Sequence, residues 1–392
     1  MSAKVLISGA SIGGPALALW LGRNGYDVTV VEKSPAVRAG GQAVDFKGRT
    51  HRMVLDRMGI WDDVVAAQTA KTDTRLVDGA GRVKAVIPGE FVGGDVEIAR
   101  GDLAAVLHAH SAADADYVFD DEIVALRPTT DGVDVSFARR PSERFDLVVG
   151  ADGIHSAVRA LAFGPEEEHV QGLGHYYAVA DAAVPTHDLV TELPDGRAVA
   201  YGYNEPGRYV ALGGSKAPQL FVFRAASADY DRRDVDSQKR FLADHFRDVG
   251  WRVPEVLEAA LGASEFYLDA LARTTMTGYT RDRVALVGDA GYANTLGGFG
   301  TGLALVGAYV LAGELVAAGG DHPAALAAYD RRMRPLTKIA RSGSAGPFLA
   351  PPSGWRIRAR DLTFSSPVLF GAMMKLTDFF ATDDSLPAYP LR

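Results

Sequence analysis

A glycine-rich turn between a short apolar strand and a helix constrains the fold of this chain more than any other feature. Residues 4–8 are aliphatic and β-branched, which predicts a buried strand, and the turn Gly9-Ala10-Ser11-Ile12-Gly13-Gly14 follows directly. Residues 15–23 predict a helix with Pro15 in its first turn, where a missing N–H costs little. Residues 27–31 predict a second strand. The chain therefore begins with a βαβ unit whose two strands are parallel.

This turn is typical of a dinucleotide site. The backbone N–H groups of such a turn and the N-terminus of its helix attract a pyrophosphate. Glu32 ends the second predicted strand, where an acidic side chain accepts hydrogen bonds from the hydroxyls of an adenosine ribose. Ser11 stands where the usual pattern has its second glycine, and a side chain this small still permits close approach. The motif alone predicts FAD or NAD, with a tight turn that binds nothing as the alternative.

A second polar motif follows an apolar segment, residues 145–150, which predicts another strand. Asp152 and Gly153 come next, and the spacing continues to Ser156 and Arg159. An Asp directly before a helix caps it, which accounts for Asp152 and Ser156. Capping leaves Arg159 unexplained, so we expect this motif to do more than begin a helix.

A third motif joins an acid to a run of glycines. Asp289 follows a predicted strand at residues 283–287, and the carboxyl edge of such a strand is where α/β sheets bind ligands. Four glycines between 297 and 302 then precede an apolar helix predicted over 302–318. The N-terminus of that helix carries about half a positive charge, which suits the anionic edge of a reduced flavin. A flexible loop is the alternative, but glycines directly before an apolar helix favour backbone packed against a flat ligand.

Composition excludes several classes of site. The chain has 392 residues, no cysteine and a formal net charge of −8. Disulfides, zinc thiolates, iron–sulfur clusters and thiol nucleophiles are therefore excluded, and no metal site is predicted. The negative charge favours neither a nucleic acid nor an anionic membrane as partner. Glycines interrupt the apolar N-terminus, unlike a secretion signal, so we expect a cytoplasmic protein.

The three motifs in this order resemble the group A flavoprotein monooxygenases, the aromatic hydroxylase family. The style is closest to the tetracycline-inactivating and polyketide-tailoring members, and residues 98–103, 250–254 and 327–335 add to the likeness. The resemblance implies an α/β fold: a Rossmann-like FAD-binding domain, an interleaved antiparallel-sheet substrate domain and a C-terminal helix. The expected bounds are 1–71, 100–168 and 280–345 for the FAD-binding domain, 72–99 and 169–279 for the substrate domain, and 346–392 for a C-terminal bridging helix and tail.

The resemblance also implies cofactors and roles. Members of the family bind FAD, use NAD(P)H and O2 as co-substrates, and hydroxylate small organic molecules through a flavin C4a-hydroperoxide. Glu32 would then bind the adenosine ribose, Arg100 and Asp289 the pyrophosphate or ribityl chain, and Asp152 would serve both FAD and NAD(P)H. The complete set of expected cofactor contacts is Gly9, Ser11, Ile12, Gly13, Gly14, Glu32, Lys33, Gly41, Asp45, Arg100, Asp152, Asp289, Gly300, Thr301 and Gly302.

The sequence departs from the family pattern in one loop. The family usually has His and Pro after Gly-Asp-Ala, whereas Tyr292 stands here for the His and Leu296 lies near the Pro position. The loop also looks one residue short before Gly298. We expect this change to affect flavin mobility and oxygen transfer rather than FAD binding, and we assign no catalytic residue.

The substrate, an aromatic or polyketide-like small molecule, is expected to lie over the antiparallel sheet. The chain is expected to be a monomer or a homodimer. Aromatic side chains in alternating strands mostly form core, so the candidate contacts are hypotheses only. These candidates are His175, Tyr201, Tyr203, Phe221, Phe223 and Arg224.

Three other readings compete with this one. An NAD-dependent dehydrogenase explains the first motif but leaves the motifs at Asp152 and Asp289 without a role. A flavin-dependent halogenase commonly carries a Trp-x-Trp-x-Ile-Pro signature, which is absent from this sequence. A degenerate flavoprotein that binds a small molecule without efficient oxygenation is supported only by the altered loop.

Overall fold

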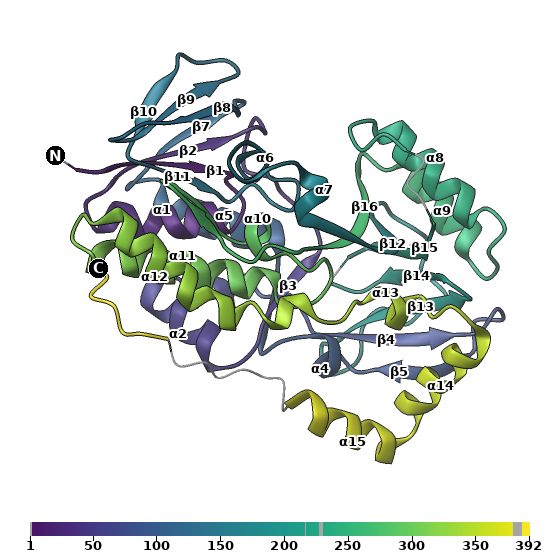
Figure 1. Cartoon of the computed structure of the whole chain (residues 1–392). Helices are drawn as coiled ribbons and strands as arrows, with labels where there is room; N and C mark the ends of the chain where they lie inside the picture. The colour runs from purple at the N-terminus through teal and green to yellow at the C-terminus, as the bar shows by residue number, and fades with distance from the viewer. Residues whose placement is uncertain (1, 216, 227–229, 379–385) are drawn as a thin grey trace.

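Two large sheets organise the chain (Figure 1). The computed structural model describes residues 2–215, 217–226, 230–378 and 386–392. A six-stranded, mostly parallel sheet takes its strands from the beginning, middle and end of the chain, and a seven-stranded, mostly antiparallel sheet takes its strands from the two segments between. This confirms the expected α/β fold with an interleaved second sheet.

The first sheet has the order β17-β18-β11-β1-β2-β7, and only the β17–β18 pair is antiparallel. Apolar residues make β1 and β11 strands that are buried on both faces, as a parallel sheet with both faces covered requires. The predicted strand at 145–150 is in fact two strands, because residue 146 lies between the end of β10 and the start of β11. The strands are β1 (Lys4–Ser8), β2 (Asp27–Glu32), β7 (Asp116–Phe119), β11 (Leu147–Gly150), β17 (Thr280–Arg281) and β18 (Val284–Leu286).

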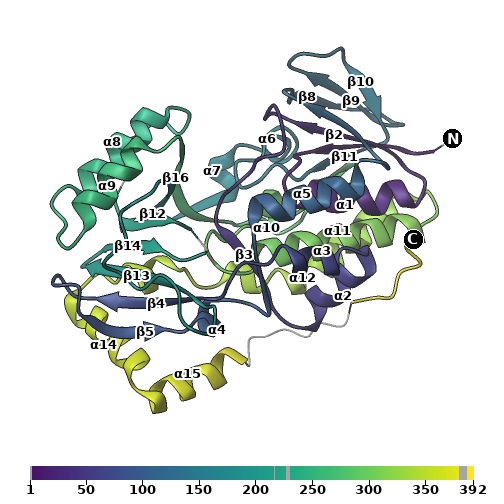
Figure 2. The ribbon, with the colours of Figure 1, turned by 180° about the vertical axis from the view of Figure 1, so that it is seen from behind.

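Long helices cover one face of this sheet, where α1 (Gly13–Arg23) packs against α11 (Gly300–Ala317) (Figure 2). The helix α11 has the length and hydropathy of a membrane span, but 78% of it is buried, as in a core helix. The other helices of this half are α2 (Arg49–Met58), α3 (Trp61–Ala66), α5 (Arg100–Ser111), α6 (Ala157–Phe163), α7 (Glu166–His169), α10 (Asp289–Tyr292), α12 (His322–Leu336) and the 3-10 turn Ile339–Arg341.

Two small sheets flank the first one. The strands β8 (Ile123–Pro128), β9 (Val133–Phe137) and β10 (Glu143–Phe145) form an antiparallel sheet that packs against the central strand β1 and against α6. The strands β3 (Ala43–Phe46) and β6 (Val96–Ala99) pair antiparallel, which places the segment before β3 beside the start of α5.

The second sheet has the order β16-β12-β15-β14-β13-β4-β5. Figure 1 places α8 and α9 on one side of it and α14 and α15 on the other. Side chains alternate between the two sides, so Phe221 and Phe223 pack under α8 and α9 whereas Tyr177 and Val222 face the opposite way. The elements are α4 (Gly89–Val92), α8 (Val235–Phe246), α9 (Val253–Gly262), β4 (Thr72–Val77), β5 (Val83–Ile87), β12 (Val170–Asp181), β13 (Ala198–Glu205), β14 (Arg208–Gly213), β15 (Gln219–Arg224) and β16 (Glu265–Thr274).

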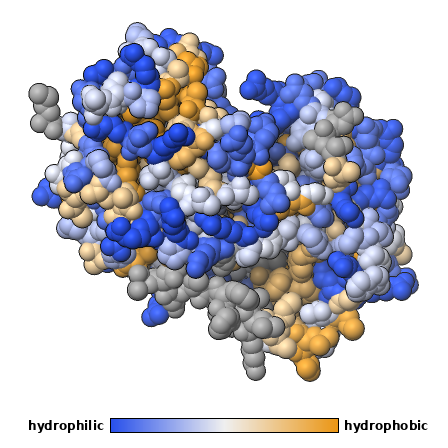
Figure 3. All heavy atoms as spheres, in the orientation of Figure 1, coloured by the Kyte–Doolittle hydropathy of each residue, from blue (hydrophilic) through white to orange (hydrophobic). Residues whose placement is uncertain are grey.

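The C-terminal region differs from the single helix that we expected. Three helices follow one another, α13 (Gly346–Leu349), α14 (Gly354–Ser365) and α15 (Pro367–Asp378), because Pro367 cannot continue α14. Val368 and Leu362 are exposed, and Figure 3 shows an apolar surface where α14 and α15 lie. The tail returns to the first half, where the Tyr309 hydroxyl donates to the Pro387 carbonyl (2.8 Å) and the Tyr389 hydroxyl donates to Glu314 (2.6 Å).

Candidate active site

The turn after β1 brings the N-terminus of α1 to the carboxyl edge of the sheet. Gly9 has φ +106°, a conformation that only glycine adopts at low cost, and its N–H donates to the Val31 carbonyl (2.8 Å). A Cβ on Gly14 would overlap the Gly9 carbonyl oxygen, so the helix starts in direct contact with the turn. No side chain in the described part of the chain caps α1. Its first N–H groups therefore remain available for an anion.

Glu32 ends β2 beside this turn. Its two carboxylate oxygens accept hydrogen bonds from the backbone N–H groups of Ala10 and Ser34, both at 2.9 Å. These bonds hold the carboxylate in place and leave each oxygen a second lone pair. A fixed carboxylate next to a pyrophosphate-binding turn is suited to accept from neighbouring ribose hydroxyls.

Arg100 begins α5 and reaches the same turn. Its guanidinium donates to the Ser11 hydroxyl (3.0 Å), and its side chain lies beside Gly41. The backbone N–H of Arg100 donates to the Gln42 carbonyl, which ties the segment before β3 to the start of α5. Arg100, Gly41 and Lys33 are exposed, so this cation is open to a ligand.

Asp289 lies between this cation and the second helix N-terminus. Gly300, the first residue of α11, lies so close that a Cβ on it would be 3.1 Å from the Asp289 carboxylate. Desolvation raises the pKa of Asp289, and the nearby positive charge of Arg100 partly offsets that rise. The side chain is nevertheless solvent-accessible. The Asp289 carboxylate is thus both accessible to solvent and desolvated, as expected for a group at the bottom of a recess.

The helix α11 also begins without a side-chain cap, so the N–H groups of Gly300, Thr301 and Gly302 have no side-chain acceptor among the described residues. His51 of α2 packs on this end, because a Cβ on Gly302 would overlap its ring. The His51 Nδ1 accepts from the Lys47 N–H (3.3 Å), and burial lowers its pKa, so the neutral ring carries its proton on Nε2. His51 was not among the expected site residues, because an isolated histidine carries no local signal of such a role.

The side chains of the Asp152 motif bond mainly to other groups of the protein. Asp152 accepts hydrogen bonds from the Ser156 hydroxyl and the Val158 N–H, and burial raises its pKa. Arg159 is completely buried and donates to the carbonyls of Ala290 (2.9 Å) and Ile154 (2.5 Å). Arg159 thus ties the second motif to the turn that carries Asp289. This contact explains the arginine that capping left unexplained.

Two residues of the altered loop, Tyr292 and Leu296, have packing roles in the structure. Tyr292 is buried against Gly307 of α11, and its hydroxyl lies 3.4 Å from that of Tyr329, so it fills the core behind the loop. Leu296 has φ +56°, a strained conformation for a branched side chain, and belongs to the apolar cluster on the sheet face that carries Tyr177.

Asp45, on β3, accepts from the Gly94 N–H (3.1 Å).

The structure does not bring the expected substrate residues together. Tyr203, Phe221 and Phe223 belong to the cluster under α8 and α9, and Tyr201 lies on the same sheet side. His175 shares the opposite side with Tyr177 and packs against Gly346 of α13, and its Nε2 lacks a partner in the described part of the chain. Tyr177 and Tyr209 occupy the side that Leu296 reaches. The two-residue period from His175 would have identified Tyr177.

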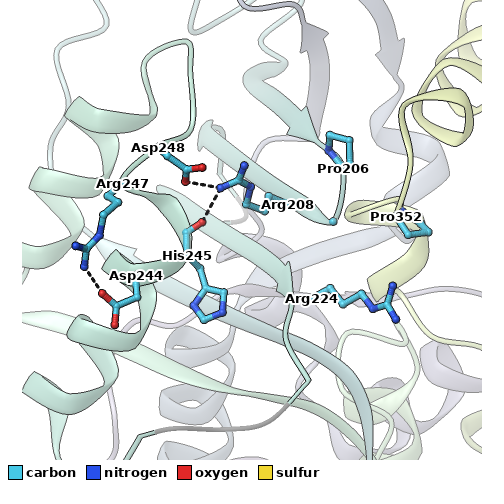
Figure 4. A pocket seen from close by; sticks show the side chains of 9 residues that line it. Pro206, Arg208, Arg224, Asp244, His245, Arg247, Asp248 and Pro352 are labelled. Carbon is cyan, nitrogen blue, oxygen red and sulfur yellow. Dashed lines mark hydrogen bonds and ion pairs between the residues drawn. The ribbon is translucent and has the colours of Figure 1, made fainter.

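Arg224 lines a separate cavity of about 560 Å³ between the β13–β14 turn and the end of α8 (Figure 4). Arg208 pairs there with Asp248, and Arg247 pairs with Asp244. Neither helix N-terminus nor Asp289 lines this cavity. Arg224 is therefore not part of the recess at Asp289.

Comparison with known proteins agrees with this geometry. The family model described as FAD binding domain matches residues 2–341. The chain belongs to this family. A flavin-dependent monooxygenase from Legionella longbeachae is 37% identical over 347 residues, which is 84% of this chain and 85% of that protein. An uncharacterised protein from Mycobacterium tuberculosis is 41% identical over 336 residues, 83% of this chain and 88% of that one.

Solved structures give the same result for the whole length. The tetracycline destructase Tet(55) superposes with a TM-score of 0.80 at 34% identity, covering 99% of both chains. Tet(51) gives 0.83 at 30% identity, covering 99% of this chain and 100% of that one. This member of the FAD-binding domain family is a FAD-dependent monooxygenase with the architecture of the tetracycline destructases, which confirms the resemblance drawn from the three motifs.

Asp289→Asn should separate cofactor binding from stability in this flavoprotein. Because the pKa of Asp289 is raised in the folded protein, the stability that this group contributes is present at low pH and is lost as the pH rises through the folded pKa. The variant apoprotein should therefore melt at a higher temperature than wild type at pH 7. Its affinity for FAD should fall about tenfold, because one charge-assisted hydrogen bond becomes neutral. Calorimetry of apoprotein and FAD titration test both effects, and a lower melting temperature with unchanged FAD affinity would contradict them.

Proposed function

We propose that this monooxygenase binds one FAD per chain, non-covalently, in the recess at Asp289, and uses NAD(P)H and O2 to hydroxylate an aromatic or polyketide-like small molecule. One observation carries the proposal. Two helices without side-chain caps, α1 and α11, begin at the same edge of the sheet, with the exposed Arg100 and the desolvated Asp289 there too. Such an arrangement suits a long anionic cofactor with a polyol.

The residues present fit FAD along its length. The N-terminus of α1 and Arg100 would hold the pyrophosphate, and Glu32 the adenosine ribose. Asp289 would accept from the ribityl hydroxyls. The N–H groups of α11 and the Nε2–H of His51 would donate to the pyrimidine edge of the ring.

FAD, when bound, supplies the redox chemistry between NAD(P)H, O2 and the substrate. The chain itself binds FAD and the substrate, orients them toward each other, and excludes water. The N-terminus of α11 favours negative charge on the ring edge that it faces, as does any array of uncapped backbone donors. His51, being neutral, adds a hydrogen-bond donor there without adding a positive charge.

The substrate side is the sheet face that carries Tyr177, Tyr209 and Leu296. It is mostly apolar with two hydroxyls, which suits a flat ring system bearing polar groups. Two structural relatives are named tetracycline destructases, and we extend that fused-ring substrate class to this chain. The expected domain bounds, the cytoplasmic location and the monomer-or-homodimer state stay predictions.

Oxidation of NAD(P)H tests the function directly. FAD-loaded protein should show a flavin spectrum and should oxidise NADH or NADPH faster when tetracycline or a simple phenol is added. A new product heavier by one oxygen should accumulate, detected by mass spectrometry. A flavoprotein that binds the ligands but forms no such product would be the degenerate binder that the altered loop allows. Protein that takes up no flavin would contradict the proposal as a whole.

Leu296 should make oxygen transfer depend on the substrate. Its side chain and strained backbone shape the substrate side of the recess in place of the usual proline region. We expect hydrogen peroxide to form when a poorly fitting analogue is supplied, because such an analogue accepts oxygen poorly. The amount of NAD(P)H oxidised then exceeds the amount of product. The measurement is peroxide yield per NAD(P)H across analogues, with Leu296→Gly as the comparison. Equal, complete coupling with every analogue in both proteins would show that the altered loop has no effect on oxygen transfer.

A further inference from the structure

A cavity lined by three arginines lies apart from the recess at Asp289, and the proposed function gives it no role. Its volume is about 560 Å³, a size that holds a small molecule (Figure 4). Its walls come from the β13–β14 turn, the end of β15, the end of α8 and the segment before α14. The lining residues are Pro206, Gly207, Arg208, Arg224, Asp244, His245, Arg247, Asp248 and Pro352.

Two of the three arginines are already paired with acids of the chain. Arg208 pairs with Asp248 and also with Glu205, at 2.6 Å from the second carboxylate. Arg247 pairs with Asp244. Figure 4 draws the pairs of Arg208 with Asp248 and of Arg247 with Asp244 as dashed lines. These ion pairs shape the cavity but add almost no net charge to it.

Arg224 is the uncommitted cation of this cavity. Its guanidinium has no hydrogen bond or ion pair with any residue that the structure describes, and no dashed line reaches it in Figure 4. Its backbone is nevertheless fixed, because its N–H donates to the Gly207 carbonyl (2.9 Å). A guanidinium binds a carboxylate through two parallel hydrogen bonds. Three arginines against two aspartates in the lining leave one positive charge in excess, and Arg224 carries it.

His245 contributes a second polar group from α8. Its Nδ1 lies 2.8 Å from the Phe241 carbonyl, so the Nδ1–H donates there. Its Nε2 has no partner in the described part of the chain. The ring packs on Phe223 and Phe241, with centroids 4.6 Å and 4.7 Å away. The imidazole is therefore held in place by its neighbours, and its Nε2 remains available to a ligand.

The wall opposite α8 is held by hydrogen bonds of the protein itself. The Gly207 N–H donates to the Pro351 carbonyl (2.8 Å), directly before the lining residue Pro352. The side-chain oxygen of Asn204 accepts from Arg360 of α14 (2.7 Å), which fixes the other side of the same turn. Because this wall is ordered in advance, a ligand gains affinity without the cost of ordering it.

We propose that this cavity binds a small organic monocarboxylate. The carboxylate lies on Arg224, and the apolar body of the ligand packs on the two prolines of the lining and on the His245 ring. A singly charged ligand is favoured over phosphate, because Asp244 and Asp248 line the same cavity and repel a second negative charge. The site is separate from the recess at Asp289, so the proposal does not rest on the proposed function.

Fluorine NMR of 4-fluorobenzoate tests the site on the full chain with FAD present. The probe should bind wild type saturably, whereas the neutral 4-fluorobenzamide should bind at least about tenfold more weakly. Inorganic phosphate should displace the probe poorly. Arg224→Gln should raise the dissociation constant of 4-fluorobenzoate about tenfold, because the charge-assisted hydrogen bonds are lost. Arg224→Lys should give an intermediate value, since the charge stays and the planar fork is lost.

Arg331→Gln is the matched control, because Arg331 is exposed and without a partner among the described residues but lies on α12, outside the cavity. It should bind the probe as wild type does. Asp244→Asn reverses the charge argument: it releases Arg247, so it should tighten 4-fluorobenzoate and let phosphate compete. No saturable binding to wild type, equal affinity in Arg224→Gln, or an equal loss in Arg331→Gln would overturn the proposal.

Discussion

Gly14→Ala should nearly abolish FAD binding and destabilise the protein by about 3 kcal/mol. The added Cβ would overlap the Gly9 carbonyl oxygen, and it would also lie within 3.3 Å of Ile7. The overlap with Gly9 is with backbone, so no flexible side chain can move away to relieve it. The start of α1 must shift instead, which turns its N–H groups away from the pyrophosphate. Loss of two such hydrogen bonds corresponds to a dissociation constant about 100-fold higher.

The measurement combines denaturant unfolding of the apoprotein with FAD titration. Gly262→Ala is the matched control, because Gly262 ends α9 with open space where its Cβ would go. That variant should bind FAD as wild type does and should be equally stable or slightly more so. If Gly14→Ala had wild-type stability and affinity, the close approach of helix and turn would have no role in binding.

Glu32→Ala should raise the dissociation constant for FAD by about 10-fold to 100-fold, because each hydrogen bond to a charged group contributes about 1.5–3 kcal/mol. The carboxylate is held by Ala10 and Ser34 at 2.9 Å each, so it is already in position before a ribose arrives. Removing it also leaves those two N–H groups without their acceptor. Part of the loss therefore comes from a looser turn.

Glu32→Gln distinguishes the two contributions. The amide keeps the size and one acceptor oxygen, so one of the two backbone N–H groups keeps its acceptor while the other faces the amide NH2, and half of the acceptor capacity is lost. We expect an affinity between those of wild type and Glu32→Ala, measured by fluorescence quenching of FAD. Unchanged affinity in both variants would mean that Glu32 is only an acid at the end of a strand.

The sequence predicted the first half of the fold well, because its elements have local signals. Gly9 to Glu32 shows strand, turn, helix and strand in a spacing that few folds share, and the structure contains each of them. The helix α11 was also predicted to within two residues, since its apolar residues directly follow the glycines of the third motif. Interleaving of the two sheets was expected from the family resemblance.

Contacts between distant segments were not predictable in the same way. Arg159 donates to Ala290 across the two polar motifs, and nothing near Arg159 in the sequence indicates that partner. His51 meets Gly302 only after α2 and α11 pack together. Aromatic side chains in strands were assigned to the substrate without knowing which sheet face they occupy, and the structure places Phe221 and Phe223 under α8 and α9. The break at Pro367 was visible in the sequence but was not used.

The order of strands in the first sheet has a consequence for synthesis of the protein. The strand β1 pairs with β11, and β11 pairs with β18 through Val148 and Val284, so neighbours in this sheet are far apart along the chain. A nascent chain leaves the ribosome N-terminus first, and β1 must wait for β11 and then for β18 before the sheet is complete. Five of the seven strands of the second sheet, β12 to β16, emerge between those last two partners. Because its apolar strands are exposed throughout that interval, production at low temperature or with added chaperones should raise the yield of folded protein.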